Sequence, residues 1–268
     1  MKIFSVIMSM LMLASCTLSA KNHYPAEYLE KTTWHEVHVD NWTGIIVQGV
    51  YTVEVKIMPD SAGILRVLAN DAMMRDLDAR TDGVTLKIGM HQHKKNCNRK
   101  AAPLIIAYSN GNLSQATLQG SGDILLSSLK TNTQLNLLLQ GSGDIELTGA
   151  SVGELDALLQ GSGDIDIEKT TVKGNVNLSL QGSGDINVWK LKATTVNGSV
   201  KGSGDIDLHG STKTLNLVLQ GSGDIDAANM KADEIKANAI GTGGITIGHA
   251  TKVDVKGKNI RQSKKIKH

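Results

Sequence analysis

Three kinds of side chain that bind ligands recur together along this 268-residue chain. A carboxylate, a hydroxyl and an amide return about every 20 residues within the sequence Gln-Gly-Ser-Gly-Asp-Ile. Such oxygen and nitrogen atoms suit a hard cation such as Ca²⁺ or the hydroxyl groups of a glycan. The three rows are Asp123, Asp144, Asp164, Asp185, Asp205 and Asp224, then Ser121, Ser142, Ser162, Ser183, Ser203 and Ser222, and then Gln119, Gln140, Gln160, Gln181 and Gln220.

Each row has a structural and a functional interpretation. Carboxylates stacked ~4.8 Å apart repel one another, so they need either bound cations or backbone N–H donors. We favour donors, and expect each Asp to accept the N–H groups of its own Gly-Ser-Gly turn. The Ser and Gln rows either form side-chain ladders that stabilise stacking, or present a flat polar face that binds a glycan or a partner protein.

Catalysis is not indicated by these rows. A serine that recurs six times cannot be one nucleophilic centre, and no His recurs beside it to act as its base. The sequence therefore predicts neither an enzyme nor a cofactor. A weak metal candidate is the H-x-H-x3-C pattern of His91, His93 and Cys97, which offers ligands for Zn²⁺ or Cu. No fourth ligand is evident and the flanking residues 94–100 are basic, so a solvated loop is the favoured interpretation.

The repeat itself predicts the element that positions these rows. The first glycines lie at positions 120, 141, 161, 182, 202, 221 and 241, a period typical of repeat architectures. Apolar residues alternate with polar ones on both sides of each turn, as in half-buried strands. We predict an all-β, single-domain β-solenoid with coils of about 20 residues, parallel in-register sheets and an aliphatic interior. A propeller is the main competitor, but its blades need about 40 residues.

Composition supports a stack of tight coils. Aromatic residues make up only 3% of the chain, which suits a Leu/Ile/Val column better than an ordinary globular core. The 28 glycines and 3 prolines fit many tight turns, and we expect the turn glycines to permit positive φ and close backbone approach. The net charge of +2 is too small to indicate nucleic acid as a partner.

The sequence divides into segments of different regularity. We predict irregular coils over residues 34–110, regular coils over 111–257 and a basic tail over 258–268, with a domain boundary near 100 as the alternative. Only Asp71 to Arg80 has a pattern compatible with a short helical turn. A right-handed coil is expected because most β-helices of this size have that hand.

The amino terminus resembles a bacterial export signal. Lys2 precedes an apolar run that ends in Leu13-Ala14-Ser15-Cys16, which resembles a lipobox. We therefore predict a signal peptide over 1–15, a lipidated Cys16 and a tether over 16–33. The alternative is a plain signal peptide cleaved near Ala20. Thr17, rather than Asp, follows the cysteine, and by resemblance to enterobacterial sorting signals this favours the outer membrane.

The repeat also resembles a known family. Gly-Ser-Gly-Asp-Ile at a 20-residue step, preceded by strands over 45–57 and 84–88, is similar to the head GIN domain family of auto-transporter adhesins. The resemblance covers roughly residues 34–250. It implies a β-helical fold and a cell-surface or periplasmic setting, and it supplies no catalytic residues. This chain departs from the pattern at Lys201 and Gly244.

These observations lead to one functional expectation and two alternatives. We expect an outer-membrane lipoprotein, held in the bilayer by its lipid, whose solenoid is an adhesin-like binding scaffold for a glycan or an envelope protein. One alternative is a polysaccharide lyase or hydrolase built on a β-helix. It would need a groove in which unlike acidic and basic groups meet. The other is a purely structural envelope component.

Overall fold

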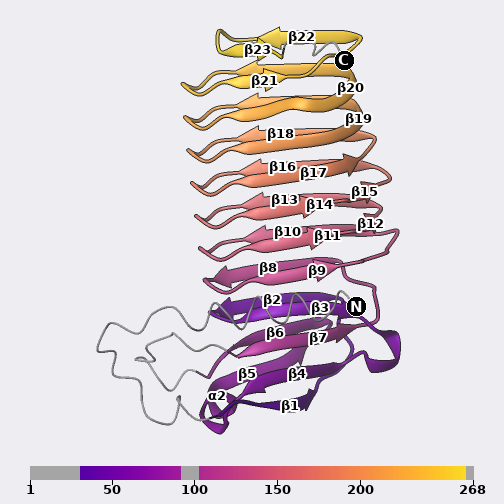
Figure 1. The fold of residues 1–268 in the computed structure, drawn as a ribbon, viewed down its shortest axis with the longest axis vertical. Coiled ribbons are helices and arrows are strands. Elements are labelled where there is room, and N and C mark those ends of the chain that lie inside the picture. Colours follow the sequence, from indigo (N-terminus) through magenta and orange to yellow (C-terminus); the bar gives the residue numbers. More distant parts are fainter. Residues whose placement is uncertain (1–30, 92–102, 264–268) are drawn as a thin grey trace, which may run out of the picture. The chain divides into compact units, whose positions relative to one another are not determined.

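The computed structural model describes residues 31–91 and 103–263. Residues Thr32–His268 form one compact unit, and its strands build a β-solenoid of about seven turns with coils of roughly 20 residues (Figure 1). The predicted fold class is therefore confirmed, whereas the handedness stays a prediction. Among the described residues, no helix combines the length and apolar character needed to cross a membrane.

Each regular coil contributes one strand to each of two long sheets (Figure 1). In the regular coils, sheet I is formed by the strands that follow the Gly-Ser-Gly-Asp turns, and irregular strands continue it at both ends. In order along the column, sheet I contains β7 (Leu104–Ser109), β3 (Thr52–Ile57), β9 (Ile124–Ser127), β11 (Ile145–Thr148), β14 (Ile165–Glu168), β17 (Ile186–Lys192), β19 (Ile206–Leu219), β20 (Ile225–Ala239), β21 (Ile245–Ile247) and β23 (Ile260–Gln262).

In the regular coils, sheet II is formed by the strands that precede those turns, and β6 (Thr85–Met90) and β22 (Lys252–Lys256) continue it at its two ends. β19 and β20 are long enough to belong to both sheets, and the short strands β12 (Ser151–Val152) and β15 (Thr171–Val172) lie between the two sheets in sequence. In order along the column, sheet II contains β6, β2 (Gly44–Gly49), β8 (Gln115–Gly120), β10 (Gln134–Leu139), β13 (Glu154–Leu159), β16 (Asn175–Leu180), β18 (Thr195–Val200), β19, β20 and β22.

The coils stack in register around an aliphatic core, as predicted. Ile145, Ile165 and Ile186 are direct partners in neighbouring strands of sheet I, and none of the three is exposed to solvent. Leu139, Leu159 and Leu180 form the equivalent buried row in sheet II. Because strand side chains alternate between faces, in-register stacking brings like residues together both inside and outside the column.

The first third of the chain departs from the predicted parallel stacking. The coil made of β2 and β3 lies between β6 and β7 on one side and β8 and β9 on the other, so coils are not stacked in chain order. Beyond β6 and β7 the pairing is antiparallel, through β1 (Thr33–His38), β4 (Ile64–Ala69) and β5 (Leu77–Asp82). An alternating apolar strand can pair on either edge, so sequence order alone does not decide its neighbours.

Short helical elements accompany the antiparallel strands. The α2 helix (Asp71–Asp76) occupies part of the segment with helical potential, while the rest of it is β5. The Asn70 side chain accepts the Met73 N–H at 2.9 Å and caps α2. A 3₁₀ turn, η2 (Pro59–Ser61), connects β3 to β4. At the other end β23 pairs with β21, so the solenoid extends beyond the predicted boundary at residue 257 into the segment expected to be a tail.

Candidate functional site

The Gly-Ser-Gly-Asp turns form one continuous corner along the column, which we call the GSGD corner. Its first and third positions are glycines because the backbones of adjacent coils approach closely there. A methyl carbon built on Gly163 would lie 1.9 Å from the Gly143 carbonyl oxygen. The glycines of the Gly-Ser-Gly-Asp turns do not have positive φ. The expected close approach of backbones is therefore confirmed, whereas the expected positive φ is not found.

The Asp row of the GSGD corner connects successive coils. Each carboxylate accepts the backbone N–H of the equivalent residue in the next coil, not an N–H of its own turn, so the predicted turn contact is wrong. The physical reason is that stacking places the next coil's N–H beside Oδ1. The N···Oδ1 distances are 3.2 Å for Asp123–Asp144, 2.9 Å for Asp144–Asp164, 2.8 Å for Asp164–Asp185 and Asp185–Asp205, and 2.6 Å for Asp205–Asp224 and Asp224–Gly244.

The Gln row is an amide ladder. Each Nε2 donates to Oε1 of the next amide, at 2.9 Å for Gln119–Gln140 and Gln140–Gln160 and 3.2 Å for Gln160–Gln181. Lys201 interrupts the row, so Gln220 lies beyond the continuous part. Gln48 extends the ladder at its other end, 2.9 Å from Gln119. The dipeptide Gln48-Gly49 matches the first two residues of the repeat, and this partial match could have indicated from the sequence that Gln48 belongs to the ladder.

The Ser row is the part of the corner that stacking leaves available. All six side chains are at exposed positions at the tips of the turns. Within the described part of the chain, none of their hydroxyls forms a hydrogen bond, whereas their backbone N–H groups bond the preceding coil, as in Ser162 to Gly141 at 2.9 Å. Stacking therefore uses the Asp and Gln side chains and leaves the serine hydroxyls able to meet a ligand.

A second row of acidic side chains, not singled out from the sequence, runs along the outer face of sheet I. It contains Glu146, Asp166, Asp207 and Asp226, with Asn187 in register between Asp166 and Asp207. Asn187 donates to Asp166 at 3.0 Å. The sequence feature that indicates this row is the polar residue directly after each Ile of the motif. Because strand side chains alternate between faces, that residue lies on the outside of the column.

The two acidic rows influence each other's titration. Partial burial raises the pKa of Glu146, and the charges of Asp166, Asp123 and Asp144 add to this effect. Burial and the charge of Asp226 likewise raise the pKa of Asp207, which His209 partly opposes. Burial raises the pKa of Asp164 in the corner row. This face is therefore an anionic surface whose charges are incompletely compensated.

An aromatic pair lies beside the second acidic row. The Trp189 and His209 rings, from adjacent coils, are stacked with centroids 3.8 Å apart and an interplanar angle of 16°. Trp189 is 48% exposed, which is unusual for so large an apolar side chain. We call this pair the Trp189–His209 platform. Its signal in the sequence was a tryptophan at an outward position directly after the inward Val188.

Of the three candidate metal ligands, the described structure includes His91 alone. The backbone N–H of His91 donates to the Asp76 carbonyl oxygen at 3.0 Å, while His93 and Cys97 lie outside the described residues. Over residues 31–91 and 103–263, no group of three His, Cys, Asp or Glu side chains is arranged to hold a metal ion. The cation interpretation of the Asp row therefore gains no geometric support.

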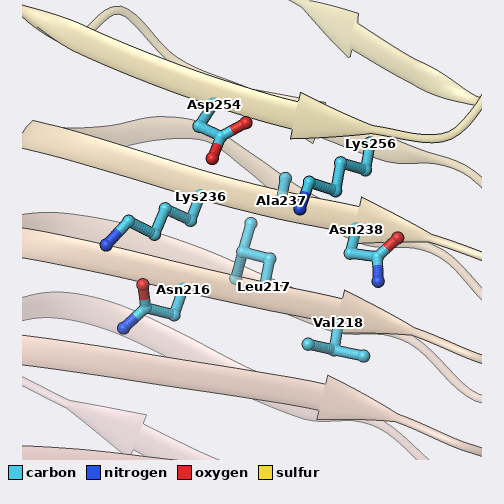
Figure 2. Close-up of a pocket in the computed structure, with 8 residues that line it drawn as sticks. All are labelled: Asn216, Leu217, Val218, Lys236, Ala237, Asn238, Asp254 and Lys256. Atoms are coloured by element: carbon cyan, nitrogen blue, oxygen red, sulfur yellow. The ribbon is translucent and has the colours of Figure 1, made fainter.

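Grooves near the carboxyl-terminal end of the described column combine acidic and basic side chains. One, of about 200 Å³, lies on sheet II where Asn216, Lys236 and Asp254 follow one another in adjacent strands (Figure 2). Lys256 extends over the same groove, which thus mixes both charges without forming an enclosed pocket (Figure 2). Another, of about 460 Å³, lies at the last turn of the corner and is lined in part by Asp224, Asp226, Lys258 and Arg261.

Comparisons with known proteins identify relatives of this repeat. A family model described as "Putative auto-transporter adhesin, head GIN domain" matches residues 41–172 and 157–260. No curated protein matches the chain.

Solved structures share the fold at low sequence identity. A "putative adhesin" from Parabacteroides merdae has a TM-score of 0.75 at 20% identity, covering 87% of this chain and 97% of its own. One from Parabacteroides distasonis has a TM-score of 0.74 at 20% identity, covering 87% and 96%. A "putative lipid binding protein" from Parabacteroides distasonis has a TM-score of 0.54 at 21% identity, covering 87% and 97%. At these identities the likeness establishes the fold alone.

Proposed function

Since the chain belongs to the head GIN domain family, we propose that it is a non-enzymatic, adhesin-like binding scaffold of the bacterial cell envelope. A stack of in-register coils presents rows of identical side chains at a fixed spacing along a rigid column. Such a surface suits an extended ligand that itself has repeating units. The family name and the names of the similar structures support binding rather than catalysis.

We place the principal ligand contact on the Trp189–His209 platform, and this exposed aromatic stack is the observation that carries the proposal. His209 covers one face of the Trp189 indole, so we assign the C–H groups of a pyranose ring to the other face, while nearby carboxylates and amides accept the hydroxyl protons of the sugar. Asp207 and Asn187 lie in the adjacent outward row and supply such groups. The serine hydroxyls of the GSGD corner extend the same polar surface for a longer oligosaccharide.

The charge of this face restricts the ligand. Neighbouring carboxylates whose pKa values are already raised by burial and mutual repulsion would also repel a polyanionic glycan. We therefore propose an uncharged glycan or one that contains amino sugars. A basic envelope protein is the other partner that this charge would accept, and the glycan experiment below separates the two.

Replacing Trp189 tests the glycan proposal. We expect Trp189→Ala to weaken glycan binding about 30-fold, which corresponds to about 2 kcal/mol. This is the size of effect found when a tryptophan that becomes buried in a complex is removed. A glycan array identifies the ligand, and calorimetry with that glycan measures the change. Trp34→Ala is the matched control, because Trp34 is 44% exposed on β1 and contacts the Arg66 guanidinium 5.0 Å away. Equal weakening by both variants, or no glycan retained by the unaltered chain, would contradict the proposal.

We propose further that Cys16 carries a lipid that anchors the chain in the outer membrane. Residues 1–30 lie outside the described structure, and the proposal depends on the lipobox-like Leu13-Ala14-Ser15-Cys16. We expect Cys16→Ser to abolish incorporation of labelled palmitate and to release the protein from the membrane fraction, because a lipid chain supplies most of its membrane affinity. Unchanged labelling or membrane retention in this variant would refute lipidation at Cys16.

A polysaccharide lyase or hydrolase is the second candidate, favoured by the groove that joins Asp224 and Asp226 to Lys258 and Arg261. Unlike acidic and basic groups in one groove are what such chemistry requires. However, Oδ1 of Asp224 already accepts the Gly244 N–H at 2.6 Å, and Oδ1 of Asp226 accepts the Ala228 N–H at 2.8 Å. Formation of shortened oligosaccharides from a panel of polysaccharides would select this candidate over the scaffold.

A further inference from the structure

The described column ends at the strands β22 and β23. Among residues 103–263, β22 pairs with β20 alone and β23 pairs with β21 alone, so both strands have one free edge. Val253 and Val255 on β22 are 39% and 45% exposed. Their register partners Ile235 and Ala237 are 0% and 3% exposed. The two valines therefore occupy core positions that no further coil covers.

The opposite end of the described column shows that such exposure is not a general property of its ends. There the last described strand, β1, also pairs on one edge only, with β4, but its inward residues His35 and Val37, the register partners of Val67 and Leu65, are half-buried rather than exposed. A free strand edge with apolar inward side chains is a template for another strand. The difference between the ends indicates that the β22 edge is a place of attachment.

The residues of β22 indicate which strand would attach. Its sequence, Lys252-Val253-Asp254-Val255-Lys256, alternates outward charged residues with inward valines. A two-fold axis relates two copies of one strand in antiparallel pairing. Two copies can therefore meet with Lys252 opposite Asp254 on the outer face and valines together on the inner face. We propose that the protein forms a symmetric dimer in which the β22 strands of two copies pair antiparallel, joining the two columns end to end.

Charge selects the register of this pairing. An axis at Val253 places Lys252 opposite Asp254 of the second copy, twice, and covers both valines. An axis at Asp254 would place like charges opposite each other, which destabilises a strand pair. An axis at Val255 would place Lys252 opposite Lys258 and draw in Gly257, whose φ of 119° departs from strand geometry. The axis therefore passes beside Val253.

The same axis is compatible with both sheets. A two-fold axis perpendicular to the sheet planes reverses strand direction but leaves inward side chains facing inward. The free edge of β23 would consequently face the β23 edge of the second copy, and the aliphatic core would continue from one column into the next. This proposal depends on the open edge alone and is independent of the glycan site.

Cross-linking of the full chain in intact cells tests the dimer. Val253→Cys, in a Cys97→Ser background, is treated with a short bismaleimide, and dimers are separated on a denaturing gel. We expect Val253→Cys to form at least about fivefold more dimer than Val84→Cys, because only Val253 would lie beside its own copy. Val84 is the matched control, since it is 62% exposed and remote from β22.

A charge exchange tests the register. Lys252 donates a hydrogen bond to Glu234 of its own chain at 2.9 Å, so Lys252→Glu is combined with Glu234→Lys and added to the Val253→Cys chain. This places the new carboxylate at position 252 opposite Asp254 of the second copy and should lower the cross-linked fraction about fivefold. Adding Asp254→Lys, together with Lys236→Glu at its own register partner, restores the opposite-charge pairs between copies and should restore the dimer. If Val253→Cys cross-links no more than Val84→Cys, the edge is covered by something other than a second copy and the proposal fails. Failure of the charge exchange to restore the dimer would overturn the register and the symmetric interface with it.

Discussion

Gly163→Ala is expected to destabilise the protein by at least about 3 kcal/mol. The added methyl carbon would lie 1.9 Å from the Gly143 carbonyl oxygen, far inside van der Waals contact. The coils cannot separate to accommodate it, because the Ser162 N–H donates to the Gly141 oxygen at 2.9 Å and the Asp164 N–H donates to Asp144 at 2.9 Å. Relief of the clash would break bonds that join these coils.

Denaturant unfolding followed by circular dichroism measures this loss. Ser162→Ala is the matched control, because the neighbouring Ser162 side chain is exposed and has no hydrogen bond within the described structure. We expect Ser162→Ala to change the free energy of unfolding by less than about 0.5 kcal/mol. Equal stability of the two variants would show that the coils do not approach at the corner as described.

Ile165→Ala is expected to cost about 2–5 kcal/mol, the range for removing a large aliphatic side chain from a packed core. Ile165 is completely buried between Ile145 and Ile186 in the central part of the column. In a stacked repeat each coil is stabilised by its neighbours, so a cavity here weakens the interfaces on both sides.

The control for this change is Ile240→Ala. Ile240 is 66% exposed at a corner position that Gln occupies in most coils, so its truncation leaves no cavity. We expect a change below about 0.5 kcal/mol. If both isoleucine variants unfold at the same denaturant concentration, the aliphatic column does not stabilise the fold in the way that burial indicates.

The regular part of this fold could be predicted because its information is local and repeated. Ile145, Ile165 and Ile186 follow glycine turns at a constant interval, and the polar residue after each of them alternates outward. A coil of that length cannot bury its own aliphatic face, so stacking in register is the arrangement that satisfies both core and backbone. The same argument placed the Asp, Ser and Gln rows on one corner.

The roles within the rows could not be predicted, because they depend on distances between coils. The Asp164 carboxylate accepts the N–H of Asp185 and not an N–H of its own turn. A small displacement of the side chain along the column separates these two arrangements, and the residue pattern is the same for both. The stacking of Trp189 on His209 similarly depends on the register of two strands that contain an irregularity after Val188.

Side-chain alternation and turn glycines act within a few residues of each other, so the coil length, the aliphatic interior and the identity of the polar rows follow from the residue pattern alone. Three other features arise from long-range contacts: the β2–β3 coil lies between strands from later in the chain, the Asp side chains bridge coils, and Val253 and Val255 are exposed at the last described coil. These features depend on which strand edges pair. Because an edge offers the same backbone hydrogen bonds to any strand, the residue pattern does not determine which strand becomes its neighbour.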